Sequence, residues 1–348
     1  MENRTFLLIL SGLLTALFAW AFPRLHRKEW QFLAAVPVEE EGPGGSWRGM
    51  NLTFYGFFVA TANAVALMLY IVLVSAAGLE IKTVFLLTGA TFLICLPGAR
   101  IIAGLVEGKK NTFTVAGASF AGLMTFPLVV WLINAVVAGP LVPILPAFAG
   151  LTASYALGEG LGRLACLSFG CCCGKPVSLF SPLAETLLRP FSITFTGHTK
   201  KVSYEGKYFE EALVPVQMLT ALVHAVVTVL ATALYLYGMY AWSAMLAVGA
   251  TQSWRVASEF LRSDHRGGGR FTAYQAMSVL SMIGAGLILK FAPETERAMP
   301  DLSRGVATLW TPEVILAVQA LWLVVFFYMG RSTVTESRIS FSVRPDRV

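Results

Sequence analysis

An arginine and four cysteines lie together at the end of a long apolar segment of this chain. Residues 162 to 176 read GRLACLSFGCCCGKP, and Arg163 therefore falls inside the apolar stretch from 144 to 170. An ionised guanidinium in membrane hydrocarbon costs at least roughly 2.5 kcal/mol unless it is paired or faces water. Arg163 is therefore predicted to belong to a functional site.

A second charged pair occurs in the later apolar stretch 242 to 261. Arg255 and Glu259 are four residues apart, which places them on one face of a helix where they can form an ion pair. A buried ion pair adds little net stability, because desolvation offsets the attraction, so function is the favoured explanation. The alternative is that the helix ends early and both side chains reach the headgroup level.

Arg100 is the third arginine at predicted membrane depth, and it follows Pro97-Gly98-Ala99 in an apolar stretch. Three buried cations require an anion. A guanidinium presents a planar fork of donors that matches phosphate oxygens, whereas lysine offers only a point charge. The three arginines together predict a phospholipid headgroup as the ligand, although Arg100 alone is equally explained as a residue at a helix end.

Two further polar residues are weaker candidates. His224 lies in an apolar stretch, where a lone histidine is more often a hydrogen-bonded structural residue than a base. Tyr55 opens another apolar stretch, and tyrosines are common at membrane interfaces. Neither residue predicts chemistry by itself.

The cysteine run from Cys171 to Cys173 follows Cys166 closely in sequence. Neighbouring side chains are expected to diverge, and metal sites usually use Cys-x-x-Cys spacing, so one tetrahedral metal ion fits the run poorly. Tight packing of small side chains is the favoured interpretation, with a reactive or redox thiol and a metal ligand as alternatives. Cys95 is isolated and is predicted to be a small core residue.

The elements that position these residues are predicted membrane helices. Hydrophobic residues make up 56% of the 348 residues and charged residues 13%, about half the charge of a soluble domain. Continuous apolar runs long enough to cross a bilayer predict an all-α, polytopic helix bundle. The nine predicted spans are 5 to 22, 52 to 76, 83 to 106, 113 to 138, 144 to 170, 214 to 240, 242 to 261, 271 to 291 and 309 to 329.

The chain divides into three parts in this interpretation. Residues 1–50 form a retained membrane anchor and a polar connector without a core, since no small-residue cleavage site follows the first span. Residues 51–291 form the membrane core, with a small strand-containing extramembrane head at 174–213 that rests on the helix ends. Residues 292–348 add a helix and a flexible basic tail. The net charge of +6 is scattered between spans, which favours anionic lipid over nucleic acid as the partner.

Several motifs, in order, resemble those of the prolipoprotein diacylglyceryl transferase family. The resemblance covers residues 52 to 291 and implies a seven-helix core, to which the first and last spans are additions. The matching segments are Tyr55-Gly56, Gly98-Ala99-Arg100, Gly117 to Leu123, Gly162-Arg163, Gly170 to Pro176, Pro215-Val216-Gln217 and Arg255 to Asp264, followed by Gln275.

This resemblance implies an enzyme of the bacterial cytoplasmic membrane that moves the diacylglyceryl group of phosphatidylglycerol to the cysteine thiol of a lipoprotein precursor. It implies no metal and no soluble cofactor. By the same resemblance, Arg163 and Arg255 hold the headgroup and Glu259 orients Arg255. The residues that it implies for substrate binding are Tyr55, Arg100, Gly170, Gly174 and Gln217.

The sequence also departs from the family pattern at positions that concern the acceptor. The family's histidine, a base for the incoming thiol, aligns with Ala121, and its motif asparagine aligns with Cys166. The acidic residue after Gly170 aligns with Cys171, and Leu219-Thr220 replaces a Tyr-Glu pair. The competing hypothesis is therefore a lipid-binding or assembly protein that has kept the fold without catalysis.

Overall fold

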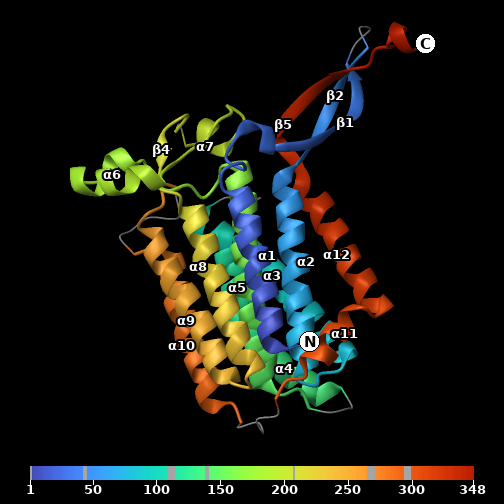
Figure 1. Cartoon of the computed structure of the whole chain (residues 1–348), viewed down its shortest axis with the longest axis vertical. Coiled ribbons are helices and arrows are strands. Elements are labelled where there is room, and N and C mark those ends of the chain that lie inside the picture. Colours follow the sequence, from blue (N-terminus) through green and yellow to red (C-terminus); the bar gives the residue numbers. More distant parts are fainter. Residues whose placement is uncertain are drawn as a thin grey trace.

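The computed structural model describes residues 2–41, 45–108, 114–137, 141–206, 208–264, 271–293 and 299–348. Within these residues, nine long helices coincide with the nine predicted spans, which confirms the helical membrane bundle. They are α1 (Asn3–Ala21), α2 (Phe54–Ala76), α3 (Ile81–Glu107), α4 (Val115–Val136), α5 (Ile144–Phe169), α8 (Val216–Leu236), α9 (Tyr240–Glu259), α10 (Ala273–Phe291) and α12 (Pro312–Gly330). The helices run side by side along the long axis of the molecule (Figure 1).

Seven of these helices are long and apolar enough to cross a membrane, and α5 and α9 are outside that set. Those two helices carry the charged residues Glu159, Arg163 and Arg255, which lower their hydropathy. Large apolar side chains such as Leu93 and Leu105 of α3 are exposed at the surface of the bundle, as expected for side chains that face lipid tails. The chain is a multi-pass membrane protein.

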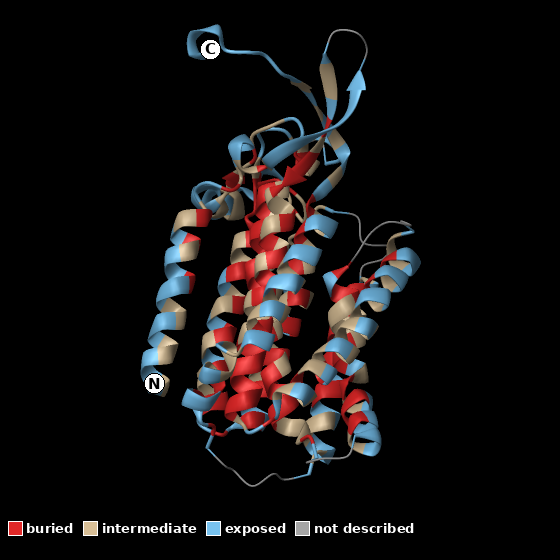
Figure 2. Cartoon of the chain, turned by 90° about the vertical axis from the view of Figure 1, so that its right-hand side faces the viewer, coloured by how far each residue is buried: buried red, intermediate tan, exposed pale blue. Residues whose placement is uncertain are grey.

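Helix α5 lies in the middle of the bundle and packs against α2, α8 and α9. Buried residues concentrate on these central helices, while α1 is largely exposed at the edge (Figure 2). Small residues allow close helix contact, as they commonly do in membranes. At Gly56 an added Cβ would lie 2.2 Å from the Cα of Gly330, so α2 and α12 cross there without side chains between them.

A small head covers one end of the bundle, as predicted (Figure 1). Its two-stranded sheet pairs β3 (Ile193–Thr194) with β4 (Ala212–Leu213) in antiparallel fashion. The head also contains α6 (Pro182–Leu188), α7 (Lys201–Tyr204) and 3-10 turns at Val177–Leu179 and Arg189–Phe191. At the opposite end, α11 (Leu302–Leu309) packs against α2.

A second sheet corrects the predictions for the connector and the tail. The strands β1 (Phe32–Glu41), β2 (Ser46–Thr53) and β5 (Arg331–Ser340) form an antiparallel sheet in the order β1-β2-β5. The connector is therefore a hairpin, and the tail is a paired strand over residues 331–340 instead of a flexible segment. Residues 42–44 of the connector lie outside the described residues.

A buried lysine ties the head to the helix ends and predicts a pH dependence of stability. Lys200 is fully buried, and its Nζ donates to the carbonyl oxygens of Leu25 and Ser168. Burial lowers the pKa of Lys200 from 10.5 to about 7. Between these values the unfolded chain holds a proton that the folded chain releases, so stability rises with pH by up to about 1.4 kcal/mol per unit.

The expected measurement is thermal unfolding of the purified protein from pH 7 to pH 9, compared with Lys200→Met. The wild type gains stability relative to the variant as the pH rises, because methionine has no proton to release. Using the difference between the two proteins cancels the titration of the other groups. Parallel curves would show that Lys200 keeps its charge in the folded state.

Candidate functional site

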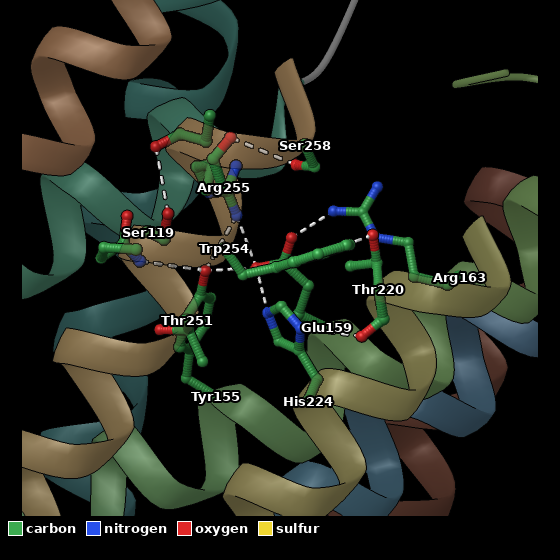
Figure 3. Close-up of polar contacts among 12 residues, drawn as sticks. Ser119, Tyr155, Glu159, Arg163, Thr220, His224, Thr251, Trp254, Arg255 and Ser258 are labelled. Carbon is green, nitrogen blue, oxygen red and sulfur yellow. Dashed lines mark hydrogen bonds and ion pairs between the residues drawn. The ribbon is translucent and has the colours of Figure 1, made fainter. Parts of the chain in front are cut away.

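The polar cluster at the centre of the bundle is built on Glu159 of α5. Its carboxylate is buried, and two arginines bind it from different helices: Arg163 one turn later on α5, and Arg255 on α9. Each of these two arginine residues is only 8% exposed. Figure 3 shows the two guanidinium groups converging on Glu159 between α5, α8 and α9. The two arginines of the sequence prediction thus share one buried counterion.

Hydrogen bonds fix the geometry of this cluster. Nη2 of Arg163 donates to Oε1 of Glu159, and Nη2 of Arg255 donates to Oε2. The hydroxyl of Tyr155, one turn earlier on α5, also donates to Oε2. The same hydroxyl accepts from Nη2 of Arg255 at 2.9 Å and from Nε2 of Gln252 at 3.4 Å. Both carboxylate oxygens are therefore occupied and the side chains are held in place.

His224 of α8 also lies next to Glu159 in this cluster. Its Nδ1 lies 2.9 Å from the carbonyl oxygen of Thr220, and its Nε2 lies 3.6 Å from Oε2 of Glu159. The Thr220 hydroxyl accepts from Nε1 of Trp254, which links α8 to α9. A carbonyl can only accept, so Nδ1 carries a hydrogen. The structural interpretation of His224 is supported, and the residue also belongs to the cluster.

The cluster carries more positive than negative charge. Two arginines face one carboxylate, which leaves one positive charge in excess, before any proton on His224 is counted. The Nε atoms of Arg163 and Arg255 are buried without a hydrogen-bond partner. Buried donors of a charged group are normally satisfied, so these two N–H groups are free to donate to an anion.

Sequence reasoning missed Glu159, and a signal for it was present. Glu159 and Arg163 are four residues apart on one helix, the same spacing that drew attention to Arg255 and Glu259. In the structure Glu259 lies at the end of α9, where its charge and that of Asp264 act on Arg262. The carboxylate that positions Arg255 within the cluster is Glu159. A role for Glu259 in orienting Arg255 stays a proposal.

Arg100 lies in another environment. It belongs to α3, its side chain is exposed, and its Nη2 donates to the hydroxyl of Tyr328 on α12 at 2.9 Å. The contacts described above bring Arg163 and Arg255 together and place Arg100 at the bundle surface. Binding of substrate by Arg100 remains a proposal, and its surface position fits contact with lipid better than a role in the buried cluster.

The other predicted site residues gather where α5 ends. Tyr55 opens α2, and its ring packs on Phe169 with 5.4 Å between centroids. Gly170 ends α5 in the left-handed conformation at φ +75°, which favours glycine, and its amide donates to the carbonyl oxygen of Cys166. Nε2 of Gln217 donates to the carbonyl oxygen of Cys171 at 2.8 Å. These residues shape the loop beside Arg163.

Gly174 allows two backbone segments to meet in this loop. It forms a bridge with Arg262, and an added Cβ would lie 2.2 Å from the carbonyl oxygen of Val214. We expect Gly174→Ala to lower the free energy of unfolding by about 1–3 kcal/mol, because the loop must move away from the backbone at Val214. Gly286→Ala in α10 is the matched control, since its Cβ meets no atom within 4 Å and alanine favours helix. Equal thermal stability of the two variants would contradict the prediction.

The predicted divergence of adjacent cysteines is wrong for Cys171 and Cys172, which converge with Cys166, and Cys173 lies outside this group. The Sγ atoms of Cys166, Cys171 and Cys172 all lie within 4.8 Å of one another. Cys172 adopts a left-handed conformation at φ +57°, which turns the chain back toward the last turn of α5. Hydrogen bonding with Cys166 and Cys172 raises the pKa of the Cys171 thiol well above its ordinary value. Within the part of the chain that the structure describes, these three thiols form a group that could hold a metal ion.

The comparison with known families agrees with this arrangement of motifs. The family model for prolipoprotein diacylglyceryl transferase matches residues 46–291, which is most of the chain. The chain belongs to this family. The match includes α2 to α10 and both arginines of the cluster, and it leaves α1, α12 and most of the three-stranded sheet outside. No curated protein matches the chain. This family consists of transferases that act in lipoprotein biosynthesis.

Proposed function

We propose that this protein transfers a diacylglyceryl group from phosphatidylglycerol to the cysteine thiol of a lipoprotein precursor, in the bacterial cytoplasmic membrane. The observation that carries the donor assignment is the excess positive charge shared by Arg163 and Arg255 around Glu159. A phosphodiester headgroup carries one negative charge, which balances the single excess positive charge of this cluster. The two unpartnered Nε–H groups supply donors for its oxygens.

The chemistry follows from charge development at the phosphate. The acceptor sulfur attacks the glyceryl carbon, a carbon–sulfur bond forms, and the carbon–oxygen bond to phosphate breaks, while the acceptor's thiol proton is released. The bond electrons leave with glycerol phosphate, which gains negative charge. Arg163 and Arg255 are already fixed by Glu159 and Tyr155, so they stabilise this charge without rearranging. The carboxylate thus positions the arginines and takes no proton in this scheme.

One observation favours the competing function of a lipid-binding protein without turnover. Ala121 of α4 stands where the family has a histidine, and it packs against Gly98 of α3. An added Cβ at Gly98 would lie 2.7 Å from the Cβ of Ala121, so the two helices are in close contact at this point. No acid–base group is available at position 121 itself.

The deciding experiment uses the purified full chain in phosphatidylglycerol vesicles with a synthetic precursor peptide that contains the acceptor cysteine. The expected result is release of glycerol phosphate together with a peptide that has gained the mass of a diacylglyceryl group. The control peptide carries serine in place of cysteine. Lipid that copurifies in stoichiometric amount, without release of glycerol phosphate, would overturn the transferase assignment and support the silent lipid-binding function.

A further inference from the structure

We propose that Cys166, Cys171 and Cys172 form a binding site for one thiophilic metal ion, of which Zn²⁺ is the representative. Their Sγ atoms lie within 4.8 Å of one another, and those of Cys166 and Cys172 are 3.9 Å apart. A zinc–sulfur bond of 2.3 Å in tetrahedral geometry places two sulfurs about 3.8 Å apart. The three thiols are therefore close to the spacing that a single ion requires, with small side-chain adjustments.

The backbone brings these thiols together by two left-handed residues. Gly170 at φ +75° ends α5, and Cys172 at φ +57° turns the loop back over the last helical turn. The amide of Cys171 donates to the carbonyl oxygen of Cys166. A side chain in the left-handed region costs roughly 1–2 kcal/mol, and a residue with that cost is a reasonable place to look for function.

The surroundings of the thiols fit an anionic metal centre. Three thiolates around a divalent ion leave one negative charge in excess. Arg163, Arg262 and Lys201 all lie within electrostatic range of these sulfurs. The guanidinium of Arg262 is held by both oxygens of Asp264, at 2.9 and 3.1 Å. The guanidinium groups of Arg163 and Arg262 are each held by a carboxylate, so cations with fixed positions lie near a negatively charged metal–thiolate centre.

The neighbouring Cys173 is engaged elsewhere and serves as an internal comparison. It is buried, and its Sγ lies 3.3 Å from the carbonyl oxygen of Gly170 and 3.5 Å from Nε2 of Gln217. It is outside the group of three converging sulfurs. Three of these four neighbouring cysteines therefore have converging sulfur atoms, and the fourth, Cys173, is packed into the protein interior.

A site with three protein ligands has a fourth position for another ligand, as catalytic zinc sites have. Resting on the proposed function, we assign this position to the thiol of the acceptor cysteine. The thiol displaces a bound water, releases its proton to bulk water, and is held as a thiolate. That sulfur then forms the bond to the glyceryl carbon described above. This arrangement supplies the thiolate although Ala121 replaces the family's histidine.

The metal site is tested by titrating the purified, chelator-treated full chain with Co²⁺ and then Zn²⁺. We expect one Co²⁺ per chain, with thiolate-to-cobalt charge-transfer absorption that Zn²⁺ removes. Cys166→Ser, Cys171→Ser and Cys172→Ser should each weaken binding by more than about 100-fold, since even outer-shell contacts change metal affinity by about 10- to 100-fold. Cys173→Ser should stay within about threefold of the wild type.

The metal site would be overturned if folded wild type showed no charge-transfer absorption, or if Cys173→Ser lost as much metal affinity as the other three variants. A Cys166–Cys172 disulfide in protein purified without reductant, together with no metal uptake after reduction, would also overturn it. Thermal unfolding of each variant shows whether a loss of binding is a loss of folding.

Different experimental results would contradict the role of the metal in binding the acceptor thiol and the proposed transferase function. Transfer that persists in Cys172→Ser and after chelation would overturn the acceptor role and leave the transferase assignment intact. Stoichiometric Zn²⁺ in a protein that releases no glycerol phosphate would count against the transferase assignment and support the metal site.

Discussion

Replacing either cluster arginine with lysine is expected to lower the rate of glycerol phosphate release from phosphatidylglycerol vesicles by about 10²- to 10³-fold. Arg163→Lys and Arg255→Lys keep a positive charge beside Glu159, so the ion pair within α5 and the ion pair between α9 and α5 are retained. They lose the planar fork of donors, including the Nε–H groups that have no partner within the protein. The loss therefore falls on turnover more than on folding.

Arg304→Lys is the matched control for these variants. Arg304 is exposed on α11, at the end of the bundle opposite the head, and its Nη2 donates to the carbonyl oxygen of Gly78. Its replacement should leave the rate within about twofold, as expected for a surface substitution. Full activity in both Arg163→Lys and Arg255→Lys would contradict the role of the cluster in binding phosphate.

The helices of this fold can be predicted from the sequence, because local composition determines each of them. A run of apolar residues long enough to cross lipid must satisfy its own backbone, and only a helix does so within one segment. The predicted limits of α2, 52 to 76, therefore differ by only two residues at one end from Phe54–Ala76. The sheet formed by β1, β2 and β5 was not predicted, since β5 is more than 270 residues from its partner and neither outer strand alternates between apolar and polar residues.

The site was predictable in part. Arg163 and Arg255 stand out because charge at membrane depth is costly, and the structure brings both to one carboxylate. Which carboxylate they share depends on how α5 faces α9, and the spacing along one helix gives no information on that contact. Glu259 satisfies the spacing rule as well as Glu159 does, so only the packing identifies the partner within the cluster. The cysteine spacing gave a wrong prediction for a similar reason. The left-handed conformation of Cys172 brings its side chain toward Cys166, and the spacing along the chain does not reveal this.

Glu159→Gln is expected to destabilise the protein by about 3–5 kcal/mol in a neutral detergent, because it leaves two buried guanidinium groups without their shared counterion. The measurement is thermal or denaturant unfolding of the purified variant. Glu40→Gln, an exposed carboxylate of β1, is the matched control and should change stability by less than about 0.5 kcal/mol.

The lipid dependence of Glu159→Gln tests whether the cluster binds an anionic headgroup. If phosphatidylglycerol places its phosphate between Arg163 and Arg255, the lipid replaces the missing negative charge. Adding phosphatidylglycerol should then stabilise Glu159→Gln more than it stabilises the wild type, whereas the zwitterionic lipid phosphatidylcholine should stabilise both equally. A ligand that binds only the folded state at 100 times its dissociation constant adds about 2.7 kcal/mol, which is large enough to measure. Equal gains from both lipids in the variant would mean that the excess positive charge of the cluster is not where the headgroup binds.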